Sequence, residues 1–111
     1  KHYGVPAGLV TKNVPHLITK LDELNWDNPL IMASFNKRGF FVNPSNEKLI
    51  ESINTKECDF VAMSTLAAGH RNPEVAYEFL GKFEFVNSVV VGFSRLNHAT
   101  ETIEAINRAI I

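Results

Sequence analysis

The feature that most constrains this chain is its regular succession of short apolar runs and amphipathic segments. Four apolar runs, near residues 7–12, 29–35, 59–65 and 87–93, are each followed by a segment whose apolar residues recur at helical spacing. Runs without strict alternation are typical of strands in a parallel sheet, and a period of 3.6 residues predicts helices. The sequence therefore predicts an α/β fold of four consecutive βα units in one domain, residues 1–111.

Two Asn-Pro pairs supply start signals for the predicted helices. Asn43-Pro44 and Asn72-Pro73 each place an amide side chain before a proline. Asparagine is favoured as a helix N-cap, and proline is favoured at the first helical position. We therefore expect the second and third helices to begin at these pairs.

The two central units also resemble each other, which indicates how the units are arranged. Ser34 matches Ser64 and Gly39 matches Gly69 at the same offset. A repeat of about thirty residues, each a strand plus a helix, indicates a βα array. No Gly-rich first turn of the doubly wound type is present. The sequence predicts half of a (β/α)8 TIM barrel, whose full length is about 250 residues.

A half barrel leaves two strand edges unpaired and its inner surface uncovered. The chain starts with Lys1 rather than methionine, so we expect a fragment of a longer protein or a self-associating homo-oligomer. In either case the expected partner is a second half barrel, contributed by another copy or by the remainder of a longer chain.

Composition excludes several classes of partner. The net charge of -1 predicts no nucleic-acid binding, because such proteins usually carry a basic surface. No apolar run approaches the roughly 20 residues of a membrane helix. Cys58 is the only cysteine, which precludes an internal disulfide and fits a cytoplasmic protein. The four histidines show no metal-ligand spacing, so we expect no metal.

In TIM barrels the functional site lies at the carboxyl ends of the strands, and two of these ends carry residues suited to phosphate. Gly92 lets a ligand approach the backbone, and Ser94 can cap the last helix and donate to an anion. Free N–H groups at a helix start attract anions, and the guanidinium of Arg95 adds a cation. Ala68 and Gly69 offer a second close approach on the neighbouring loop. The ordinary alternatives are a packing glycine, a plain helix cap and a surface arginine.

Catalytic residues are not evident from the sequence. Lys12 and Lys37 follow predicted strands and are weak candidates for Schiff-base chemistry, but either position also suits an exposed loop lysine. The loop "NKRG", residues 36–39, is basic and is placed to face an anionic substrate.

Two stretches, "AMSTLAAGHRNPEVAYEFL" (residues 62–80) and "NSVVVGFSRLNHATETIEAI" (residues 87–106), resemble the last part of the barrel in aldo-keto reductases. In that family these loops hold NADP, so the resemblance implies NADP as a cofactor. It places four residues at the pyrophosphate: Ser64, Leu66, Ala68 and Gly69. It places three residues at the adenosine phosphate: Gly92, Ser94 and Arg95.

The resemblance leaves the reaction open, because the family's catalytic Asp, Tyr, Lys and His belong to the first half of its barrel. The sequence therefore predicts the phosphate-binding half of a TIM-barrel enzyme that takes a phosphorylated small molecule, with an NADP-dependent oxidoreductase as the first interpretation. A sugar-phosphate aldolase or isomerase is the alternative within this class. A non-catalytic half-barrel scaffold or fragment is the alternative outside it.

Overall fold

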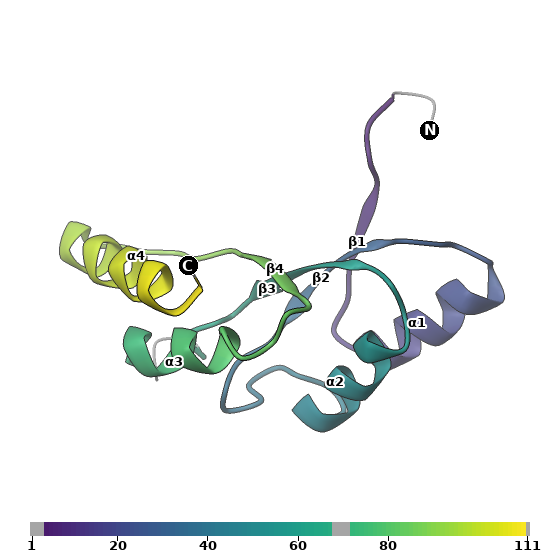
Figure 1. The fold of residues 1–111 in the computed structure, drawn as a ribbon, viewed down its shortest axis with the longest axis horizontal. Coiled ribbons are helices and arrows are strands. Elements are labelled where there is room, and N and C mark those ends of the chain that lie inside the picture. The colour runs from purple at the N-terminus through teal and green to yellow at the C-terminus, as the bar shows by residue number, and fades with distance from the viewer. Residues whose placement is uncertain (1–3, 68–71, 111) are drawn as a thin grey trace.

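The computed structural model describes residues 4–67 and 72–110, and it shows four βα units in succession (Figure 1). The strands are β1 (Gly8–Val10), β2 (Leu30–Ser34), β3 (Asp59–Met63) and β4 (Val86–Val89). The helices are α1 (Val14–Glu23), α2 (Asn46–Asn54), α3 (Pro73–Leu80) and α4 (Leu96–Ile110). The predicted α/β fold with four consecutive βα units is therefore confirmed.

The strands form one sheet in the order β1-β2-β3-β4, and every neighbouring pair is parallel. Because each strand is added beside the one before it, the connecting helices all pass over the same side of the sheet. Figure 1 shows the connecting helices α1, α2 and α3 along this side. A doubly wound sheet would instead reverse its strand order and carry helices on both faces. The arrangement is consistent with half of a (β/α)8 barrel.

Buried and partly buried side chains alternate along the two central strands, because helices cover only one face of the sheet. Ile31 of β2 and Phe60 and Ala62 of β3 are fully buried beneath the helices. Met32 and Met63, whose side chains leave the opposite face of the strands, are only partly buried. Successive side chains of a strand point to opposite faces. The sheet therefore has one covered face and one open, largely apolar face.

An aromatic cluster joins the end of β2 to the third helical unit. Phe35 is fully buried, and its ring centroid lies 5.3 Å from those of Phe83 and Phe85 and 5.4 Å from that of Phe79. Edge-on and tilted contacts of this kind stabilise a core beyond the area they bury. The cluster holds α3 and the approach to β4 against the sheet, and so sets where the β4–α4 loop emerges.

Of the two predicted helix starts, one is confirmed and one is wrong. Asn72 caps α3, with its side chain accepting from the N–H of Glu74, and the helix begins at the proline that follows. Helix α2 begins later than expected, because its N-cap is Ser45, which accepts from the N–H of Lys48. The side chain of Asn43 donates instead to the backbone carbonyl of residue 12, at 3.1 Å. That bond ties the segment to the β1–α1 loop and delays the helix.

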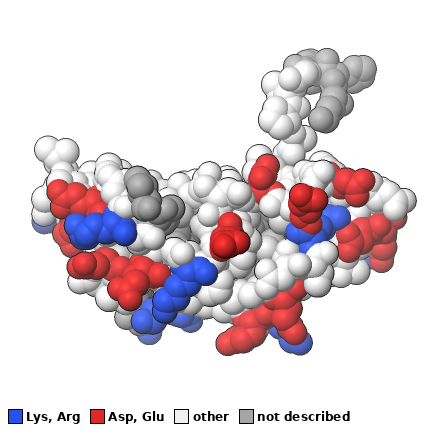
Figure 2. All heavy atoms as spheres, in the orientation of Figure 1, with Lys and Arg blue, Asp and Glu red and all other residues white. Residues whose placement is uncertain are grey.

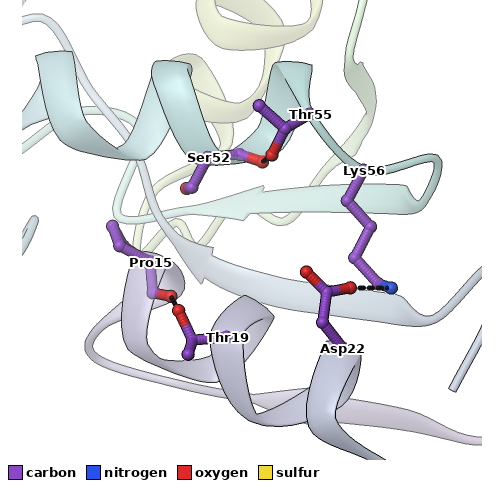
Figure 3. Close-up of polar contacts among 6 residues, drawn as sticks. All are labelled: Pro15, Thr19, Asp22, Ser52, Thr55 and Lys56. Carbon is purple, nitrogen blue, oxygen red and sulfur yellow. Dashed lines mark hydrogen bonds and ion pairs between the residues drawn. The ribbon is translucent and has the colours of Figure 1, made fainter. Parts of the chain in front are cut away.

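Polar contacts secure the first half of the chain (Figure 3). The Lys56 ammonium lies 2.7 Å from the Asp22 carboxylate, which links the α2–β3 turn to α1. The lysine side chain is only 10% exposed, while that of Asp22 is 60% exposed. The hydroxyls of Thr19 and Thr55 donate to nearby backbone carbonyls within their own segments.

The surface carries both signs of charge. In the view of Figure 2, acidic and basic side chains are interspersed over the helical side of the molecule. No helix within residues 4–67 and 72–110 is long and apolar enough to span a membrane.

Candidate functional site

A pocket of about 480 Å³ lies at the carboxyl edge of the sheet, between the loops that follow β3 and β4. One wall comes from the β3–α3 loop and the start of α3. The other comes from the segment after β4 and the first two turns of α4. The parallel sheet brings these loops together because the carboxyl ends of all its strands meet at one edge.

Four of the residues predicted to bind the phosphate or cofactor line this pocket, namely Ser64, Leu66, Gly92 and Ser94. Arg95 is exposed beside the pocket and is not part of its lining. The predicted contributions of Ala68 and Gly69 lie outside the described residues. The structure thus brings together the two loops that the sequence singled out.

The backbone at Gly92 is open to the pocket. A Cβ added at this position would meet no atom within 4 Å. The residue is therefore not required for helix packing, which was the ordinary explanation for a glycine here. A ligand can approach the main chain at this point without a side chain in the way.

No side chain of residues 4–67 or 72–110 is seen to cap the start of helix α4. The N–H of Ala99 donates to the carbonyl of Arg95 at 3.2 Å, which closes the first turn. The expectation that Ser94 caps the helix is not met, since its hydroxyl makes no hydrogen bond to another residue in the described part of the chain. The N–H groups of residues 96–98 likewise have no acceptor among the described residues. These donors, with the positive end of the helix dipole, remain available to an anion.

Sequence reasoning did not assign the α4 wall of the pocket. His98, Glu101 and Thr102 line it from one face of the helix. Thr102 is only 2% exposed, and its hydroxyl has no hydrogen-bond partner among the described residues. Glu101 and Thr102 follow His98 by three and four residues, and this spacing places the three side chains on one face of the helix.

Thr65, which lines the pocket, belongs to a buried hydroxyl pair. Thr65 Oγ1 and the Tyr77 hydroxyl lie 2.6 Å apart, and both residues are almost fully buried. Burial raises the pKa of the Tyr77 phenol, and the hydrogen bond between its hydroxyl and that of Thr65 opposes that rise. The phenol therefore stays neutral at physiological pH. The contact joins the β3–α3 loop to α3.

The two lysines considered for covalent chemistry lie outside this pocket. Lys12 and Lys37 are both exposed on loops after β1 and β2. A nucleophilic lysine is commonly activated by desolvation in an apolar pocket. Neither side chain has such surroundings, so the structure gives no support to a Schiff-base role. Within residues 4–67 and 72–110, no three His, Cys, Asp or Glu side chains gather as metal ligands would.

Comparison with protein-family models found no match for this chain, and comparison with curated protein sequences found none either. The resemblance to aldo-keto reductases therefore rests on the two quoted stretches alone. The structure itself identifies the chain as an α/β protein of four parallel βα units with a pocket at the carboxyl edge of its sheet.

Proposed function

We propose that this chain binds a phosphorylated small molecule in the pocket between the β3–α3 and β4–α4 loops. The observation that carries the proposal is the open main chain at Gly92, where an added Cβ would meet no atom within 4 Å, in the wall of a pocket that Thr102 also lines. The Thr102 hydroxyl, which has no hydrogen-bond partner among the described residues, offers a ligand in this pocket both a donor and an acceptor.

The phosphate group belongs at the Gly92–Ser94 end of the pocket. There the main chain is open and the uncapped N–H groups of α4 begin. The carboxylate of Glu101 lines the same pocket on the second turn of the helix. A negative charge there opposes a phosphate and favours hydroxyl or amine donors, so the uncharged part of the ligand belongs beside Glu101 and Thr102.

A nucleotide such as NADP has this combination of phosphate and hydroxylated groups, as the resemblance to aldo-keto reductases implies. A sugar phosphate also has it. The proposal is therefore a binding function for a phosphorylated ligand, with an oxidoreductase or a sugar-phosphate enzyme as the activity of the complete barrel.

Titration followed by amide NMR tests this. Inorganic phosphate, ribose 5-phosphate and NADPH are each added while the amides of residues 92–97 are observed. Thr102→Val keeps the shape of the side chain and removes its hydroxyl, and we expect it to weaken ligand binding about tenfold. Thr100→Val is the matched control, because Thr100 lies on the same helix with its hydroxyl bonded to the carbonyl of Leu96. If none of the three compounds shifts these amides, the proposal is wrong.

We also propose that a second half barrel covers the open face of the sheet. Val10 and Val90, in β1 and just after β4, are 65% and 48% exposed, and these are the two edge strands. Unpaired edges and apolar surface favour association. Sedimentation over a concentration series tests self-association, which the pair Val10→Lys and Val90→Lys should weaken. If the wild-type chain is monomeric at every concentration, self-association is ruled out, and the half barrel that covers the open face must come from another protein segment.

A further inference from the structure

The wall that α4 contributes to the pocket carries a carboxylate without a cation beside it. Among the described residues that line the pocket, Glu101 is the one acidic residue, and no lysine or arginine joins it there. The ion pairs of the described chain use other carboxylates, namely Asp22, Glu23, Glu51 and Glu74. Glu101 is therefore open to hydrogen-bond donors of a ligand.

The two ends of the pocket differ in polarity. At the Gly92–Ser94 end lie the N–H groups of residues 96–98, which have no acceptor among the described residues and carry the positive end of the α4 dipole. Glu101 comes later in the helix, and its Cα lies about 6 Å along the helix axis from that of residue 97. Because helical side chains lean toward the N-terminus, a molecule as long as a sugar phosphate can reach from the first end to this carboxylate.

A second oxygen-bearing side chain adjoins Glu101. Thr102 is only 2% exposed, it lines the pocket, and its hydroxyl has no hydrogen-bond partner among the described residues. The carboxylate of Glu101 only accepts hydrogen bonds, whereas the hydroxyl of Thr102 can donate or accept. Two neighbouring hydroxyls of one ligand can donate to the two carboxylate oxygens, and either of them can also accept from Thr102. A vicinal diol therefore fits this wall better than a single hydroxyl does.

The volume of the pocket favours a small ligand. At about 480 Å³ it lies in the lower half of the range of about 300–1,000 Å³ that is typical of ligand pockets. This volume suits the phosphate ester of one sugar better than a whole dinucleotide.

We propose that Glu101 determines the specificity of this pocket, by selecting sugar phosphates whose far end carries a vicinal diol. The inference rests on the function proposed above, because it assumes that the phosphate binds at the Gly92–Ser94 end. It adds the substrate class, a pentose or hexose phosphate, and the residue that recognises it. The diol donates to the Glu101 carboxylate, and Thr102 holds one of the same hydroxyls.

The test compares two ligands that differ by one hydroxyl. Ribose 5-phosphate has a vicinal diol at C2 and C3, and 2-deoxyribose 5-phosphate has lost the C2 hydroxyl. Each is titrated against the whole chain while the amides of residues 92–97 and 101–103 are followed by NMR. We expect both ligands to shift the first set of amides. Ribose 5-phosphate should shift the second set more strongly and should bind about fivefold more tightly, as one hydrogen bond predicts.

Glu101→Gln keeps the shape of the side chain but replaces one acceptor oxygen with a donor. It should reduce the preference for ribose 5-phosphate to less than about twofold, mainly by weakening the binding of that ligand. The matched control is Glu104→Gln, because Glu104 is exposed on the same helix and is not among the residues that line the pocket. This control should keep the full preference.

The outcomes separate this inference from the function on which it rests. If both sugar phosphates shift the amides of residues 92–97 but bind equally well, the pocket binds phosphate esters and the role of Glu101 is overturned. A preference that survives Glu101→Gln, or that Glu104→Gln removes equally, overturns it as well. If neither ligand shifts any of these amides, the proposed function itself fails, and this inference fails with it.

Discussion

The hydroxyl of Ser34 donates to the hydroxyl of Ser64 over 3.0 Å, although the two serines lie thirty residues apart. They occupy matching positions in the two central units, at the end of β2 and just after β3. The bond ties two neighbouring strands together at the edge where the pocket lined by Ser64 opens. Ser64 has a positive φ of 55°, so its side chain is placed by an uncommon backbone conformation as well.

Ser34→Ala should lower the free energy of unfolding by about 1 kcal/mol, because the partly buried Ser64 hydroxyl then loses its donor. Ser64→Ala should have a similar effect. The two substitutions together should cost less than the sum of the two, since the double variant leaves neither hydroxyl unpaired. Urea unfolding of the four proteins measures this. Strictly additive effects would show that the bond contributes nothing.

Two glycines should respond oppositely to alanine. At Gly81 a Cβ would lie 2.5 Å from the backbone oxygen of Ala109 in α4, so Gly81→Ala must push α4 from α3. Overpacking of this kind costs about 1–3 kcal/mol. Gly92→Ala meets no atom within 4 Å and should change stability by less than about 0.5 kcal/mol. Thermal unfolding compares the two; a destabilised Gly92→Ala would mean that the β4–α4 loop is packed after all.

Removing the carboxylate partner of a buried lysine should lower the free energy of unfolding more than removing the partner of an exposed lysine. Asp22→Asn leaves the Lys56 ammonium, on a side chain only 10% exposed, without its carboxylate. We expect a loss of about 1 kcal/mol at low salt. Glu51→Gln removes the partner of Lys48, whose side chain is 64% exposed, and should cost less than about 0.5 kcal/mol. Urea unfolding measures both, and equal losses would contradict the distinction.

Stability should fall in alkaline solution. Burial raises the pKa of the Tyr77 phenol above its ordinary value of 10.0. Below about pH 9 the phenol is neutral in both the folded and the unfolded state. As the pH rises further, the unfolded chain loses this proton before the folded chain does, so unfolding becomes more favourable.

Unfolding free energies at about pH 8 and about pH 10.5 measure the fall, and Tyr77→Phe should reduce it. Cys58 adds to the same trend, because burial also raises the pKa of its thiol, with the Asp59 carboxylate as a second cause. The comparison is therefore made in a Cys58→Ala background. A pH dependence that Tyr77→Phe leaves unchanged would show that the phenol is not responsible.

Several features of the site could be read from the chain because they depend on neighbours in sequence. Asn72 was predicted to cap α3, and it does, since an N-cap bonds to an N–H two residues away. Ser64, Leu66, Gly92 and Ser94 were assigned to one site, and all four line one pocket. Their common position follows from the parallel topology, which places consecutive loops at the same edge, and their role in binding stays a prediction.

Other features depended on contacts between distant segments and were missed. The second helix was expected to begin at Asn43-Pro44, but the bond from Asn43 to the β1–α1 loop excludes those residues from α2. Thr102 was not assigned, because its burial arises only where α4 packs beside α3. No local pattern distinguishes it from Thr100, which is exposed two residues earlier.

By itself, then, the sequence determined the four βα units and the parallel sheet, because hydrophobic periodicity and helix caps act over a few residues. Only the tertiary structure decided which side chains meet at the carboxyl edge. It paired Ser34 with Ser64, and it placed the nearly buried Thr102 in the wall of the pocket. Such juxtapositions follow from how strands register and helices pack, and these are set by the whole core rather than by any single segment.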